Sequence, residues 1–142
     1  MKVEKMKIGQ EEILLMNALS SLTRVNAKDC IISGKNVVFV IREDEVGKAI
    51  GKKGETIKNM SDKLNKKIEI FAYTKDAKSF LEKAFREVNF DKIELIESEG
   101  KKQLEAILSG ENKRKLLSQT KKLKRIKELL QRNYNVFDVK IN

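Results

Sequence analysis

Hydrophobic and polar positions alternate with two different periods along the first part of the chain. Residues 10–23 place leucines at helical spacing, with acids in the first turn, where the helix dipole favours them. Two runs rich in β-branched residues follow, at 29–33 and 36–41. Gly34 and Lys35 separate these runs, as in a β-hairpin. The pattern predicts a helix followed by two paired strands.

A short helix, a glycine break and a longer helix come next. Residues 44–50, DEVGKAI, predict a short helix that Gly51 interrupts. The helix beyond the break carries an apolar face, and residues 66–73 alternate as a third strand. That apolar face consists of Ile57, Met60 and Leu64. The predicted order of elements is therefore α-β-β-α-α-β.

The second half of the chain repeats this order. A shift of about 66 residues superposes Gly34 and Lys35 on Gly100 and Lys101, and Met60 on Ile126. Chance similarity between two amphipathic patterns is the alternative explanation. We expect an α+β protein of two tandem domains, 1–74 and 75–142, each a three-stranded sheet covered by helices. The second domain is predicted to have a helix at 76–85, strands at 90–98 and 102–108, one helical stretch at 114–134 and a strand at 135–141.

Composition narrows the classes of function. The 142 residues are 40% hydrophobic and 37% charged, with a net charge of +10, so a polyanion is the first candidate partner. There is no histidine and one cysteine, Cys30, which gives no basis for a metal site, a cofactor or histidine-based catalysis. We therefore expect no enzyme. We expect no signal peptide, because Glu11 and Glu12 precede only a short apolar run, and no run approaches the length of a membrane span. We therefore expect a cytoplasmic protein.

The stretch AIGKKGETI, Ala49 to Ile57, sets two lysines between two glycines. Glycines at both ends let the chain turn sharply and let its backbone lie against a bulky partner. The helix that follows directs its N-terminal N–H groups and positive dipole end into the loop, which suits a phosphate. Nearby apolar residues are expected to form a floor for unpaired bases, namely Val40, Ile41, Val46, Ala49 and Ile50.

The longer stretch GKAIGKKGETIKNM resembles the Gly-x-x-Gly signature of KH domains, within the order that defines type II KH units. Two such units and little else resemble the archaeal NusA-like transcription termination and antitermination factors. The resemblance implies binding of single-stranded RNA, as a nascent transcript, and names RNA polymerase as a candidate partner; we expect a monomer. A Walker A loop is not supported, because the sixth position from Gly47 is Lys52.

The resemblance also implies which residues contact RNA. The loop residues would hold the backbone of about four nucleotides. The predicted surface in the first domain consists of Val46, Lys48, Ala49, Ile50, Gly51, Lys52, Lys53, Gly54, Thr56 and Lys58.

The second domain departs from the family pattern. The shift of about 66 residues replaces the loop glycines, and the degenerate loop consists of Leu117, Ser118, Gln119 and Thr120. Residues 113–132 nevertheless carry nine basic residues against one acid, Glu128. A solvated helix face is the plain explanation, and an electrostatic track for RNA is the functional one. The candidate contacts are Lys113, Arg114, Lys121, Lys122 and Arg125.

Two other functions remain open. A KH protein could act in ribosomal RNA binding or assembly, or on single-stranded DNA, and a degenerate second loop would also suit a protein-binding scaffold with a reduced RNA role. The aromatic residues Phe71, Tyr73, Tyr134 and Phe137 are either packing residues or platforms on which bases stack.

Overall fold

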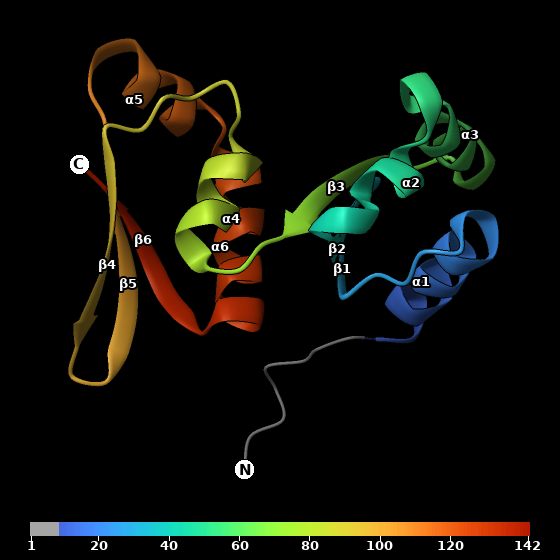
Figure 1. Cartoon of the computed structure of the whole chain (residues 1–142), viewed down its shortest axis with the longest axis horizontal. Coiled ribbons are helices and arrows are strands. Elements are labelled where there is room, and N and C mark those ends of the chain that lie inside the picture. The colour runs from blue at the N-terminus through green and yellow to red at the C-terminus, as the bar shows by residue number, and fades with distance from the viewer. Residues whose placement is uncertain (1–8) are drawn as a thin grey trace. The chain divides into compact units, whose positions relative to one another are not determined.

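The structure is a computed structural model that describes residues 9–142 and divides them into two compact units between Thr74 and Lys75. We refer to residues 9–74 as the first unit and residues 75–142 as the second unit. Each unit holds one three-stranded sheet with helices (Figure 1). Residues 1–8, which the predicted first domain includes, lie outside the described residues.

The first unit follows the predicted order of elements. Its central strand β2 pairs antiparallel with β1 and parallel with β3. A parallel pair needs a crossover connection, which the two helices between β2 and β3 supply. The elements are α1 (Gln10–Thr23), β1 (Asp29–Ser33), β2 (Asn36–Arg42), a 3-10 turn (Glu43–Glu45), α2 (Val46–Ile50), a second 3-10 turn (Lys52–Gly54), α3 (Glu55–Leu64) and β3 (Lys67–Tyr73).

The core of the first unit forms around β2, whose five apolar residues 37–41 are all fully buried. Val37, Phe39 and Ile41 form one cluster with Leu19 of α1 and Met60 of α3. Val38 and Val40, whose side chains alternate to the other face of the strand, are buried as well. The run is therefore apolar on both faces, which explains why it does not alternate with polar residues.

The second unit repeats the same topology. Its central strand β5 pairs antiparallel with β4 and parallel with β6. The prediction of two tandem α-β-β-α-α-β units is thereby confirmed. None of the helices within residues 9–142 is both long and apolar enough to cross a membrane. The elements are α4 (Ala77–Ala84), β4 (Lys92–Ser98), β5 (Lys101–Ile107), α5 (Gly110–Ser118), α6 (Thr120–Tyr134) and β6 (Val136–Ile141).

The helical part of the second unit differs from its prediction. The single helical stretch expected at 114–134 is two helices, α5 and α6, which break at Gln119 with φ −97° and ψ 59°. The break falls where the first unit has its loop between α2 and α3. Neither glycine nor proline marks it, and so the amphipathic pattern gave no signal for it.

The strand pairing matches the two hairpin turns differently from the 66-residue shift that was read from the sequence. Ser33 pairs with Asn36 across the first turn, and Ser98 pairs with Lys101 across the second. Gly34 therefore corresponds to Glu99 rather than to Gly100. Both central residues of the second turn, Glu99 and Gly100, have left-handed φ values of 53° and 78°, as a type I′ turn requires.

The cap of α4 leads to a prediction about stability. The carboxylate of Asp76 accepts a 2.8 Å hydrogen bond from the Ser79 backbone N–H, which lowers the pKa of Asp76. We expect Asp76→Ala to lower the free energy of unfolding by about 1 kcal/mol at neutral pH. A lowered pKa stabilises the fold above the unfolded value of about 4, and this contribution is lost as the pH falls through the folded pKa. Urea unfolding at several pH values should therefore show the difference between wild type and variant shrinking below about pH 4. A difference that stays constant down to pH 2 would contradict the assignment.

Candidate nucleic-acid interface

The loop between α2 and α3 turns through an unusual series of backbone conformations. Gly51 has φ 81° and ψ 172°, and Lys53 and Gly54 have left-handed φ values of 55° and 73°. The N–H of Gly51 still donates to Gly47 O at 2.9 Å, and the N–H of Gly54 donates to Gly51 O at 3.1 Å. Three of the four residues of the Gly-x-x-Gly loop thus have a positive φ, within a hydrogen-bonded turn.

Position 51 requires glycine because of its backbone conformation and because a Cβ has no space there, whereas position 54 requires it only because of its backbone conformation. A Cβ placed on Gly51 would lie 2.6 Å from Thr56 Cβ and 2.8 Å from the Thr56 backbone N. Because the second of these atoms is backbone, a change of rotamer cannot remove the overlap. A Cβ on Gly54 would meet nothing within 4 Å, so this position is constrained only by its φ. Thr56 therefore stabilises the loop by packing over Gly51.

Four lysines lie around the first turn of α3, which also holds one acidic residue, Glu55. No side chain caps α3, whose N-terminal N–H groups carry the positive end of the helix dipole. Lys52 and Lys53 are exposed at the tip of the loop, and Lys48 and Lys58 are exposed on the adjoining helices. Within the part of the chain that the structure describes, no ion pair engages any of these four lysines. The sequence predicted all four as RNA contacts.

The apolar floor beside the loop is smaller than the sequence suggested. Val40 and Ile41 are fully buried, and Ala49 is 1% exposed and belongs to the core cluster. The side chains of Val40, Ile41 and Ala49 are thus enclosed by the protein, and the contact of Ala49 with RNA stays a prediction. Val46 and Ile50 are half-buried. These two side chains are the apolar surface that is open beside the loop.

The junction between α5 and α6 lacks the conformation of the first loop. Beyond Gly110, none of the described residues of α5, the junction and α6 has a positive φ. Leu117, predicted at the position of a loop glycine, is 48% exposed. The second unit therefore has a helix junction at this place without the glycine-dependent turn.

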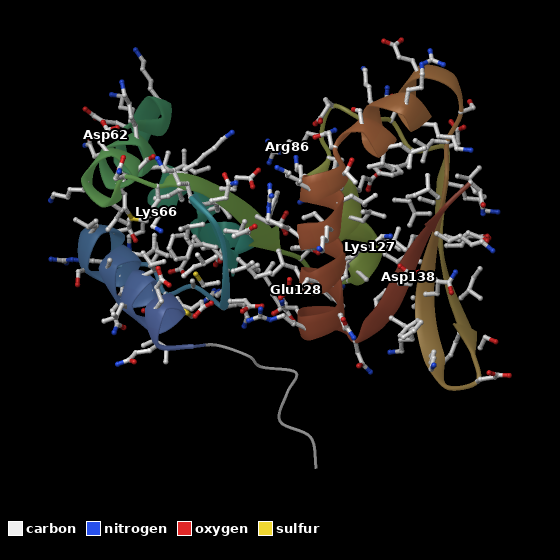
Figure 2. All side chains as sticks on the ribbon, turned by 180° about the vertical axis from the view of Figure 1, so that it is seen from behind. Asp62, Lys66, Arg86, Lys127, Glu128 and Asp138 are labelled. Carbon is white, nitrogen blue, oxygen red and sulfur yellow. The ribbon has the colours of Figure 1, made fainter. Side chains whose placement is uncertain are left out.

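Several basic side chains of the second unit are engaged inside the unit. Figure 2 shows Lys127 of α6 beside Asp138 of β6, and their Nζ and Oδ1 atoms lie 3.5 Å apart. Arg132 Nη1 donates to Glu128 Oε2 at 3.2 Å, one turn away on α6. Of the five predicted contacts, Arg114 and Lys121 are exposed, and Lys113, Lys122 and Arg125 are half-buried. Lys127 and Arg132, two of the nine basic residues within 113–132, therefore form ion pairs inside the second unit.

A set of contacts at the second junction was missed by sequence reasoning. Gln119 Nε2 donates to Glu87 Oε2 at 2.9 Å and to Lys115 O at 3.1 Å. Lys122 Nζ lies 4.8 Å from the centre of the Phe85 ring. The pKa of Glu87 is lowered, chiefly because its own backbone N–H donates to the carboxylate, and further by the Gln119 amide and by the charges of Lys122 and Lys115. Because Glu87 and Gln119 are 32 residues apart in the chain, no local pattern could have predicted this contact.

The aromatic candidates separate into packed and exposed residues. Phe71 is 8% exposed, and the Tyr134 ring packs on Phe80 with ring centres 5.3 Å apart. Phe137 is 56% exposed, and Lys101 Nζ lies 4.6 Å from the centre of its ring. Packing is therefore the role of Phe71 and Tyr134. Among residues 9–142 there is no group of three or more His, Cys, Asp or Glu side chains that could hold a metal ion.

Comparison with known proteins identifies the class of the chain. The KH domain family matches residues 15–111, a stretch that includes the whole Gly-x-x-Gly loop. The chain belongs to the KH domain family. The predicted resemblance to NusA-like KH proteins is also confirmed by two relatives, each named probable transcription termination protein NusA. The chain is 33% identical over 89 residues to the protein of Methanococcus vannielii and 32% identical over 89 residues to that of Methanocaldococcus jannaschii.

The extent of these matches differs between relatives and solved structures. The aligned region covers 63% of this chain but 51% and 49% of the two relatives, so the chain spans about half the length of the curated relatives it matches. A solved structure titled Crystal structure of APE1850 matches with a TM-score of 0.81 and 30% identity. The matched region covers 95% of the present chain and 100% of the chain in the solved structure. This match supports the two-unit fold over nearly the whole length of the present chain.

Proposed function

We propose that the protein binds single-stranded RNA through the Gly-x-x-Gly loop of the first unit and acts without catalysing a reaction. The observation that carries this proposal is the loop itself, which turns tightly because Gly51 packs against Thr56 and which ends at the uncapped N-terminus of α3. A loop of this kind lets the backbone of a nucleic acid approach the backbone of the protein.

Each part of the loop has a role in this proposal. Lys52 and Lys53 neutralise phosphates at the exposed tip, and the N-terminal N–H groups of α3 offer donors to a phosphate oxygen. Val46 and Ile50 support unpaired bases beside the held backbone. Lys48 and Lys58 flank the path of the bound RNA and attract its phosphates at long range.

The exposed basic residues of the second unit add a weaker contribution. Arg114 and Lys121 attract the RNA without holding it in one geometry, because the junction beside them lacks the turned loop. Lys113, Lys122 and Arg125 are half-buried and contribute less.

The biological role we propose is control of transcription elongation or termination on a nascent transcript, with RNA polymerase as partner, in the cytoplasm. The names of the two archaeal relatives support this role. Copurification with RNA polymerase would support it, whereas copurification with ribosomal subunits would favour a role on ribosomal RNA.

The binding proposal is tested by fluorescence anisotropy of a short unstructured RNA titrated with the protein at several salt concentrations. Contact with about four phosphates of a single strand predicts a slope near −3 for log affinity against log salt concentration. A duplex RNA of the same length serves as the control and should bind more weakly. Affinity that does not depend on salt, or a preference for the duplex, would contradict the proposal.

A further inference from the structure

The α5–α6 junction is fastened to the segment between α4 and β4. Figure 1 shows this segment, in yellow-green to yellow, passing beside α5 on its way to β4. Asn89 N donates to Asn112 Oδ1 of α5 at 3.0 Å, and the side chain of Gln119 donates to Glu87 at 2.9 Å. Lys122 of α6 covers the ring of Phe85. Three contacts thus join residues 85–89 to α5, to the junction and to α6.

The carboxylate of Glu87 places a negative charge at this junction. Its pKa is lowered, so the group is ionised at neutral pH. Lys115 and Lys122, from the two helices that meet at the junction, are the cations whose charges act on it. In the first unit the corresponding segment between α1 and β1, residues 24–28, contains no acid.

We propose that the exposed carboxylate of Glu87 acts as an intramolecular anion at the α5–α6 junction, where it takes the place that a nucleic-acid phosphate takes at the loop of the first unit. This inference rests on the proposed function and makes it more specific. The Gln119 amide donates to Glu87, and the charges of Lys115 and Lys122 act on its carboxylate, so an approaching phosphate meets a like charge. The specific phosphate contact of the protein is therefore confined to the first unit, and Glu87 adds a charge barrier to a junction that also lacks the glycine-dependent turn.

The test removes the charge of Glu87 and keeps its shape. Glu87→Gln is introduced into the wild type and into the Lys52→Asp/Lys53→Asp background, in which the first loop is disabled. We expect it to raise affinity for the unstructured RNA by about 3- to 10-fold in both backgrounds, and to steepen the salt slope by about 0.7 for one additional phosphate of a single strand. The matched control is Glu82→Gln, the same change of charge at an exposed residue of α4. The control should change affinity less than 2-fold.

Equal effects of Glu87→Gln and Glu82→Gln would overturn the inference, because the gain would then reflect net charge alone. Unchanged affinity for Glu87→Gln would also overturn it. Inorganic polyphosphate, titrated in parallel, separates this inference from the proposed function, because its binding needs no site for bases. If the wild type failed to bind RNA while Glu87→Gln bound polyphosphate more tightly than Glu82→Gln did, the inference would stand and the proposed RNA function would be refuted.

Discussion

Reversing the charges of Lys52 and Lys53 is expected to lower RNA affinity by about 2 kcal/mol, roughly 30-fold, at about 0.1 M salt. Both lysines are exposed at the tip of the loop, and no ion pair with another described residue engages either of them. Lys52→Asp/Lys53→Asp replaces two attractions to phosphate by two repulsions, so both the affinity and the salt slope should fall. Anisotropy titration with the same short RNA measures both quantities.

The fold should survive this change. Lys53 has φ 55°, a conformation that aspartate adopts more readily than lysine does. Circular dichroism should show unchanged helix content. The matched control is Lys35→Asp/Lys67→Asp, which makes the same change of net charge at two exposed residues outside the loop. Lys35 lies in the turn between β1 and β2, and Lys67, whose backbone N–H donates to Lys35 O, begins β3. Equal loss of affinity in the two double variants would mean that the whole first unit attracts RNA only through its net charge.

Replacing Gly51 by alanine is expected to lower the free energy of unfolding by about 3 kcal/mol. The pair φ 81°, ψ 172° belongs to a region that is essentially restricted to glycine, at a cost of about 1–3 kcal/mol for other residues. The new methyl group would in addition lie 2.8 Å from the Thr56 backbone N, so α3 would have to move. The midpoint of urea unfolding, followed by far-ultraviolet circular dichroism, measures the change.

Gly54→Ala is the comparison that isolates the effect of packing. Gly54 has φ 73° with open space around it, so alanine should cost only the left-handed conformation, about 1 kcal/mol. We expect Gly51→Ala to lower RNA affinity more than Gly54→Ala does, because it displaces the start of α3. Equal losses of stability in the two variants would show that Thr56 does not pack against Gly51 as described.

The spacing of hydrophobic residues was sufficient to predict the order of elements in the first unit, because each helix and strand there is marked by residues within its own few positions. The apolar run of β2, the leucines of α1 and the glycines of the loop each signal their structure within a few residues. The order α-β-β-α-α-β and its repetition followed from them. The Gly-x-x-Gly loop could be predicted for the same reason, since its residue types are required by its backbone conformation.

Features that depend on contacts distant in the sequence could not be predicted. The break at Gln119 has no glycine or proline, and its partner Glu87 lies 32 residues earlier in the chain. The burial of Ala49 and the engagement of Lys127 by Asp138 likewise depend on tertiary packing. These contacts reduce the number of residues available to a ligand, and so the candidate site is smaller than the sequence suggested.

Titration of the ¹⁵N-labelled protein with a short single-stranded RNA, followed by amide chemical shifts, tests the central claim most directly. The account predicts that the largest shifts occur at the amides of residues 51–56, with glycine signals from Gly51 and Gly54 among them, and that residues 117–120 change little. Shifts centred on the α5–α6 junction, with the loop of the first unit unchanged, would contradict it.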